Sequence, residues 1–246
     1  MLILLPPSET KRAGGTGRSL SVDALRYREL DDHRDALVDA LIDLAASPEQ
    51  SITALKLGRT QHSEVAVNGA LRSSPTMPAL DRYTGVLFDA LDAASLTPAQ
   101  RAFADSHVAV HSALFGLIHA LDPIPAYRLS HSSRIPGLSL KKHWREAVSG
   151  ILATRDDVIV DMRSEGYAEL GLAPRRPDSC YLRVLADGPD GSRRALNHFN
   201  KKAKGEFARA LIAAEQDFET LEDLCAWAAD AGFRVEPDEG ELALIV

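Results

Sequence analysis

Four polar residues that follow a short apolar segment are the first side chains that could do chemistry. The apolar segment is Leu2–Leu5, and the polar residues behind it are Ser8, Glu9, Thr10 and Lys11. Loops at the carboxyl ends of strands are where α/β proteins usually hold ligands. Hydroxyl groups and an amine suit an anion, and a carboxylate such as Glu9 can act as an acid or base. The alternative interpretation is an ordinary polar turn.

A second candidate is Arg128, which lies in a long proline- and serine-rich loop over residues 122–136. An arginine can hold a phosphate or carboxylate at two points. The alternative is a local ion pair with Asp122. The preceding residues 112–117 predict a tight turn between a strand and a helix, which would point backbone amides toward the same anion.

The stretch of residues 161–167 mixes acid, base and hydroxyl groups at the end of a predicted strand. Asp161 and Tyr167 are candidate catalytic groups, and Arg163 and Ser164 are candidate anion ligands. The alternatives for Asp161 are a helix N-cap or an ion pair with Arg163.

The strongest basic cluster begins a predicted helix at residue 200. Asn200, Lys201 and Lys204 are candidate anion ligands, because helical spacing places the two lysines on one flank of the helix and its first amides favour anions. Lys202 points away and is interpreted as solvated, and a solvated basic face is the alternative for the whole cluster. Lys142, in a helix predicted over 140–154, completes the predicted basic rim of a cleft.

Composition limits the kinds of partner. The chain of 246 residues has a formal net charge of −7, so any nucleic-acid contact must come from a local basic patch. Cys180 and Cys225 lie far apart, and a secreted chain of this size would more often carry a disulfide framework, which favours a reducing, cytoplasmic setting. Both cysteines are expected to be buried and inert. The N-terminus is not that of a signal peptide, and no segment is long and apolar enough to cross a membrane. His107 and His111 are expected on one strand face in a structural role, and the sequence predicts neither a metal site nor a cofactor.

Alternating strand and helix patterns predict one mixed α/β domain over residues 1–246, with a mixed, curved sheet flanked by helices. The expected strands are residues 2–5, 107–110, 158–162 and 242–246, with a hairpin formed by 180–185 and 193–199. The expected helices are residues 23–46, 48–68, 85–91, 140–154, 200–215 and 221–231, and one that starts at Thr97-Pro98.

Taken together and in order, these motifs resemble the YaaA family of peroxide-stress proteins. The resemblance rests on residues 2–11, 83–85, 112–116, 121–129, 158–167, 199–205 and 240–242, and on Trp144. It implies a compact α/β domain with a positively charged cleft and a helix-hairpin-helix-like element. Ala113 stands where the family has a hairpin glycine, and Glu9 where it often has a lysine.

The resemblance also implies a cytoplasmic protein that responds to peroxide, binds DNA non-specifically and limits iron-dependent damage. An enzyme acting on a small phosphorylated or nucleotide-like substrate in the same cleft is the alternative. A protein that binds iron itself ranks last, because no residue spacing supports a metal site.

Overall fold

A mostly parallel sheet forms the centre of the computed structural model, which describes residues 1–188, 193–195, 198–238 and 240–246. The strand order is β4-β3-β1-β6-β7-β10-β9, and β8 pairs with β7. Strands β3, β1, β6, β7 and β10 run parallel, whereas β4, β8 and β9 pair antiparallel with β3, β7 and β10. The strands are β1 (Leu2–Leu5), β2 (Met77–Pro78), β3 (Val108–Ser112), β4 (Gly116–His119), β5 (Pro123–Ile124), β6 (Ile159–Asp161), β7 (Ser179–Asp187), β8 (Arg193–Ala195), β9 (Arg234–Asp238) and β10 (Glu241–Ile245).

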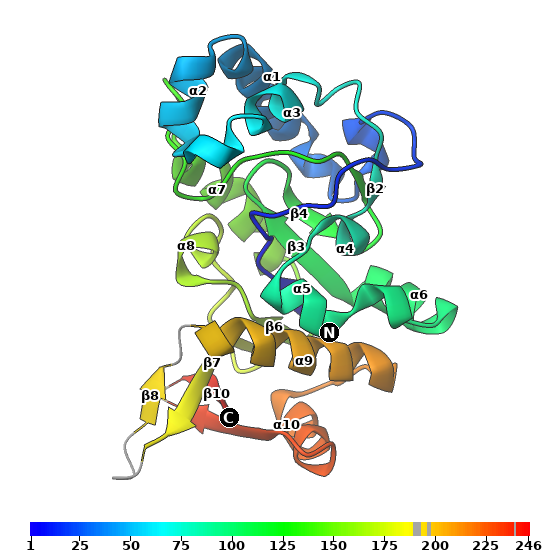
Figure 1. The fold of residues 1–246 in the computed structure, drawn as a ribbon. Helices are drawn as coiled ribbons and strands as arrows, with labels where there is room; N and C mark the ends of the chain where they lie inside the picture. Colours follow the sequence, from blue (N-terminus) through cyan, green and yellow to red (C-terminus); the bar gives the residue numbers. More distant parts are fainter. Residues whose placement is uncertain (189–192, 196–197, 239) are drawn as a thin grey trace.

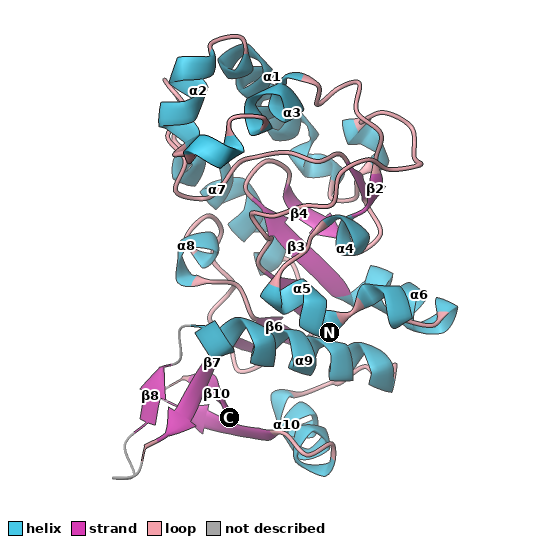
Figure 2. Ribbon diagram, viewed as in Figure 1, coloured by secondary structure: helices cyan, strands magenta, loops and turns pink. Residues whose placement is uncertain are grey.

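Helices lie against this sheet, and some of them extend the molecule beyond the sheet at one end. The longer helices are α1 (Asp31–Ala45), α2 (Pro48–Leu55), α3 (Glu64–Gly69), α5 (Val86–Leu91), α6 (Pro98–His107), α7 (Leu140–Ala153), α9 (His198–Ala214) and α10 (Leu221–Asp230). Single turns are α4 (Ala79–Arg82), α8 (Glu165–Ala168), η1 (Val22–Ala24), η2 (Arg28–Leu30), η3 (Arg59–Gln61) and η4 (Ala93–Ser95). Helices α1, α2 and α3 gather at one end of the molecule, far from α10 at the other (Figure 1). Helices α5 and α9 lie side by side across the sheet (Figure 2).

The apolar residues of β1 explain why this strand lies at the middle of the sheet. Leu2–Leu5 are all buried, since a strand with parallel neighbours on both sides is covered on both faces. Its register places Leu4 beside Ala109 of β3 and Asp161 of β6, and Asp161 beside Tyr181 of β7. The carboxyl ends of β1 and β6 therefore meet at one edge, next to the middle of β7.

The structure confirms the predicted α/β class and most of the predicted helices and strands. Thr97 caps α6 as expected: its side chain accepts a hydrogen bond from the Gln100 amide at 3.2 Å, and the Gln100 side chain accepts one from the Thr97 amide. The antiparallel pairing of β7 with β8 also agrees with the predicted hairpin, although residues 189–192 between the two strands lie outside the described residues. That residues 1–246 fold as one unit stays a prediction.

Several predicted elements were wrong. Strands β3 and β4 form a β-hairpin where a helix was expected after Ser112. Ala113 is buried in the turn of this hairpin, and its carbonyl accepts a hydrogen bond from Trp144 Nε1. His107 ends α6, so it shares no strand face with His111. The helix expected from residue 23 begins only at Asp31, and the one expected over 48–68 is interrupted at Lys56.

Two further corrections concern the C-terminal part. The second strand of the hairpin ends at Ala195, and α9 begins at His198, so the strand predicted to residue 199 is too long. Strand β9 was not expected at all.

Among the described residues, no helix combines the length and apolar character that a membrane span requires.

Candidate functional site

A pocket of about 770 Å³ lies where the carboxyl ends of β1 and β6 meet the middle of β7. Six separate segments line it, and three of them belong to polar motifs singled out in the sequence, at residues 8–11, 161–167 and 200–204. The polar lining residues are Ser8, Glu9, Thr10, Thr84, Ser130, His131, Ser164, Glu165, Tyr167, Tyr181, Arg183, Asn200, Lys201 and Lys204. Pro6, Pro7, Val86, Leu87, Phe88, Met162 and Val184 supply the apolar part of the wall.

A group of hydroxyls forms the side of the pocket that follows β1. The Ser8 and Thr10 hydroxyl oxygens are 3.2 Å apart, and the Thr84 hydroxyl donates to Thr10 Oγ1 at 3.1 Å. Thr10 in turn donates to the Thr84 carbonyl at 3.2 Å. Gly85 permits this close approach, because a Cβ there would lie 3.3 Å from both the Ser8 and Thr10 hydroxyl oxygens.

Arg128 supports the pocket from behind and does not line it. Its guanidinium, with a side chain 8% exposed, donates to Glu9 Oε2 at 2.7 Å. Its backbone is fixed by Asn68, whose side-chain amide bonds both the N–H and the carbonyl of Arg128. The partner of Arg128 is therefore Glu9 and not Asp122, so Arg128 orients a pocket carboxylate instead of offering a free charge to an anion.

Lys11 turns away from the pocket toward the interior. Its amine donates to the Ser8 carbonyl at 2.8 Å and lies 3.9 Å from the centre of the Tyr127 ring. Burial, followed by the charge of Arg128, lowers the pKa of Lys11 to about 7. Lys11 thus holds the loop in place, and the structure does not place it as a pocket ligand.

Asp161 and Arg163 form a buried ion pair beneath the pocket. The Arg163 guanidinium donates to Asp161 Oδ1 at 2.8 Å and Oδ2 at 2.6 Å, and to the Gly171 carbonyl at 2.8 Å. Its remaining contact is His111 Nδ1 at 2.7 Å, which must accept because a guanidinium only donates. The ion-pair alternative for Asp161 is thus what the structure shows, and neither side chain lines the pocket.

His111 makes folding stability sensitive to acid. Burial, followed by the charge of Arg163, lowers its pKa well below the ordinary value. The unfolded chain takes up a proton on His111 below pH 6.5 while the folded chain does not, so stability decreases as pH falls from about 6.5 to 5, by at most about 1.4 kcal/mol per pH unit. Chemical denaturation of wild type and His111→Gln across this range measures the effect. The variant should show the shallower pH dependence, and equal slopes would contradict the assignment.

The start of α9 contributes amines to the pocket. Lys204 is only 4% exposed, whereas Lys201 is exposed, and both line the pocket. Lys202 lies outside the pocket and pairs with Glu206 at 3.2 Å, as its solvated interpretation requires. Asn200 lines the pocket, and its Oδ1 is buried without a hydrogen-bond partner among the described residues.

Tyr167 and His131 form an aromatic wall between these two sides. Their rings are 5.0 Å apart and edge-on, and the imidazole packs on Gly166 so closely that a Cβ there would overlap it. Burial raises the pKa of Tyr167 and lowers that of His131. At neutral pH the phenol is a hydrogen-bond donor, and the neutral imidazole can accept a proton. His131 was missed as a candidate, although it lies in the loop over residues 122–136.

Strand β7 adds residues that the sequence analysis also missed. Tyr181 and Arg183 lie two positions apart, so they project from the same face of the strand, and this alternation was the available signal. Arg183 bonds Glu241 at 2.6 and 3.1 Å and Glu165 at 3.2 Å, so its charge is already neutralised.

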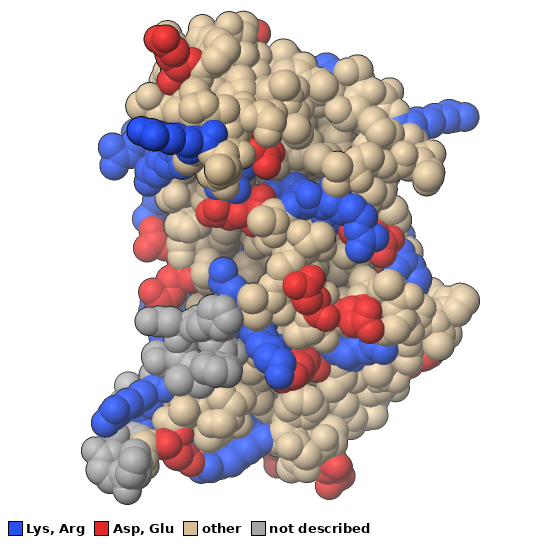
Figure 3. All heavy atoms as spheres, in the orientation of Figure 1, with Lys and Arg blue, Asp and Glu red and all other residues tan. Residues whose placement is uncertain are grey.

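Other predicted residues lie elsewhere. Lys142 is exposed on α7 and outside the pocket. Cys180 is buried, with a pKa raised by burial, but Cys225 is only half-buried. Within the described residues, no group of three or more His, Cys, Asp or Glu side chains is arranged to hold a metal ion. Basic and acidic side chains alternate across the face shown in Figure 3, where the described atoms form no continuous basic band.

The fold and the site together define an α/β protein with a polar pocket at the carboxyl edge of a mostly parallel sheet. The family profile described as "Peroxide stress protein YaaA" matches residues 1–239. The chain belongs to this family and is a peroxide-stress-related protein.

Relatives of the full length support the assignment. UPF0246 proteins of Corynebacterium efficiens and Corynebacterium glutamicum are each 41% identical, and the alignments cover all of both chains. A UPF0246 protein of Streptomyces coelicolor is 36% identical over 97% of this chain and 93% of its own.

Proposed function

We propose that this protein is an enzyme that acts on a small phosphorylated or nucleotide-like substrate in the central pocket. One observation carries the proposal: carboxylates, an imidazole, phenols and amines from five of the six lining segments face one pocket of about 770 Å³. This volume falls within the range of about 300–1,000 Å³ typical of small-molecule sites. Convergence of titratable groups from distant segments is the usual anatomy of a catalytic centre.

The contacts support distinct roles for the lining residues. Glu9, oriented by Arg128, and His131, neutral at pH 7, are suited to proton transfer. Tyr167 is suited to donating a hydrogen bond. Asp161, the third catalytic candidate, is fully engaged by Arg163 and has no part in this proposal.

A thermal-shift panel of nucleosides, nucleotides and sugar phosphates tests the proposal. A true ligand at one hundred times its Kd adds about 2.7 kcal/mol, which corresponds to a Tm increase of roughly 5–10 °C for a chain of this size. The Glu9→Gln variant is expected to reduce turnover of the ligand so identified at least tenfold, whereas Lys142→Ala, outside the pocket, should leave binding and turnover unchanged. If no member of the panel raised the Tm, the proposal would be wrong.

Non-specific DNA binding that limits iron-dependent damage is the second candidate, which the family resemblance implies. The observation that favours it is the pair of exposed amines of Lys201 and Lys202 at the start of α9. The alternation of charges in Figure 3 argues for few phosphate contacts. The same protein titrated with a DNA duplex at 50 and 200 mM salt distinguishes the candidates, because phosphate-backbone binding weakens strongly with salt.

A further inference from the structure

Lys204 carries a positive charge that the described residues do not neutralise. Its ammonium group is buried at the wall of the pocket, where it donates a hydrogen bond to the Arg163 carbonyl at 3.4 Å. No carboxylate of the described residues lies within 4 Å of it. The nearest acids are engaged elsewhere: Asp161 by Arg163, and Glu165 and Glu241 by Arg183.

An ammonium group in this position is costly unless something compensates it. Removing a charge from water without a counter-ion disfavours the charged form, and burial lowers the pKa of Lys204 to about 8. The Tyr181 ring, whose centre lies 5.0 Å from the amine, provides only partial compensation. Two of the three N–H donors of the ammonium have no protein acceptor among the described residues.

Asn200 leaves a second buried polar group open at the same wall. Its Oδ1 has no hydrogen-bond partner in the described part of the chain, and Asn200 stands one helical turn before Lys204 on α9. Rotation of the Asn200 side-chain amide by half a turn exchanges Oδ1 and Nδ2, so that Nδ2 can donate a hydrogen bond from this position. Lys201, which is exposed at the pocket rim, adds a second amine on the same flank of the helix.

We propose that Lys204 and Asn200, with Lys201 at the rim, form the subsite for the phosphate monoester group of the substrate. This inference rests on the proposed function and assigns the orientation of the ligand. The phosphate binds under the start of α9, and the rest of the molecule extends toward Glu9, His131 and the hydroxyl groups after β1. An anion of this kind supplies acceptors for the two open N–H donors and the missing counter-charge.

Calorimetric titration of the whole protein with inorganic phosphate tests the subsite. Lys204→Met is expected to weaken phosphate binding at least tenfold, whereas Lys202→Met, on the same helix but paired with Glu206, should change it less than twofold. The ligand-free Lys204→Met protein should also have a Tm equal to or above that of the wild type, because it lacks the uncompensated buried charge. A purely structural lysine would instead give a lower Tm.

Several outcomes would overturn the subsite. These are absence of phosphate binding to the wild type, unchanged binding to Lys204→Met, or displacement of phosphate by a short DNA duplex, which would assign the amine to nucleic acid. The proposed function fails separately. If nucleotides stabilise the protein but bind Lys204→Met normally, the subsite is wrong and the function stands. If phosphate binds through Lys204 and the substrate panel fails, the subsite stands and the proposed function is wrong.

Discussion

The Arg163→Met variant is expected to lose about 3–5 kcal/mol of the free energy of unfolding. The guanidinium is fully buried and donates two hydrogen bonds to the Asp161 carboxylate, which also accepts one from the Arg163 backbone amide. Its removal leaves that carboxylate buried without a counter-charge, and His111 and the Gly171 carbonyl lose a donor. Since the free energy of unfolding of a folded protein is roughly 5–15 kcal/mol in total, the variant should be close to unfolding. Urea denaturation at pH 7 measures the loss.

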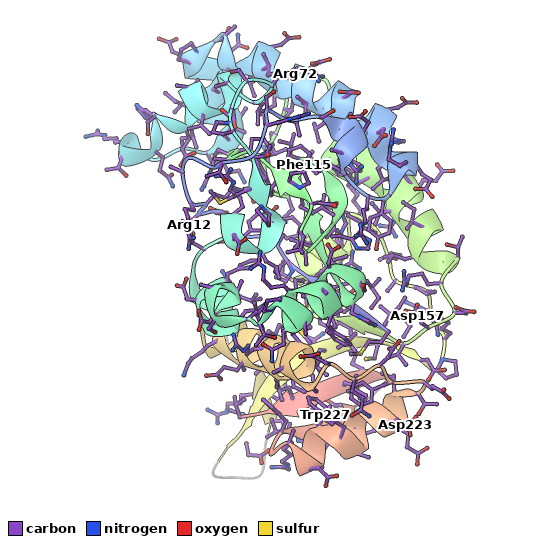
Figure 4. The ribbon with its side chains drawn as sticks, turned by 90° about the vertical axis from the view of Figure 1, so that its right-hand side faces the viewer. Arg12, Arg72, Phe115, Asp157, Asp223 and Trp227 are labelled. Atoms are coloured by element: carbon purple, nitrogen blue, oxygen red, sulfur yellow. The ribbon has the colours of Figure 1, made fainter. Side chains whose placement is uncertain are left out.

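Two comparisons isolate the cause of this effect. Arg72, which is labelled on the helices at the top of Figure 4, pairs with Asp35 and Asp39 on the surface. Arg72→Met should therefore cost less than about 1 kcal/mol. The double variant Asp161→Leu/Arg163→Met should recover much of the loss, because it removes both charges together. A loss below 1 kcal/mol in Arg163→Met alone would show that the ion pair does not support this edge of the sheet.

Gly205→Ala should destabilise the protein by about 1–3 kcal/mol, although alanine is the better helix former. A Cβ at position 205 of α9 would overlap the Leu87 carbonyl oxygen of α5 and lie 2.8 Å from Ala90 Cβ. The overlap is with backbone, so the two helices must move apart. Because Leu87 and Lys204 both line the pocket, substrate binding should weaken as well.

Gly150 of α7 provides the matched control, because nothing lies within 4 Å of the Cβ position there. Gly150→Ala is expected to stabilise the protein by about 0.5–1 kcal/mol through helix propensity alone. Thermal and urea unfolding should therefore show stability changes of opposite sign in the two variants. If Gly205→Ala also stabilised the chain, the close contact between α5 and α9 would be refuted.

The family, the fold class and most elements could be predicted from the sequence, because these depend on local patterns. The apolar Leu2–Leu5 run, the Thr97 cap and the basic start of α9 each carry their own signal within a few residues. The motif after β1 and those at residues 161–167 and 200–204 were also expected to meet in one cleft, the first because loops at the carboxyl ends of strands usually hold ligands. Ser8, Glu9, Thr10, Ser164, Tyr167, Asn200, Lys201 and Lys204 do line one pocket.

Only the tertiary structure decided which way each charged side chain faces. Arg128, Lys11 and Arg163 have the composition of anion ligands, yet the first two support the β1 loop and the third holds Asp161. Helical spacing separated Lys204 from Lys202, which was expected to be solvated and pairs with Glu206. It could not show that Lys204 is buried with no carboxylate of the described residues within 4 Å. The reason is physical: the burial of a charge, and often its partner, depend on segments far apart in the sequence that meet only when the sheet forms, as Arg128 and Glu9 do.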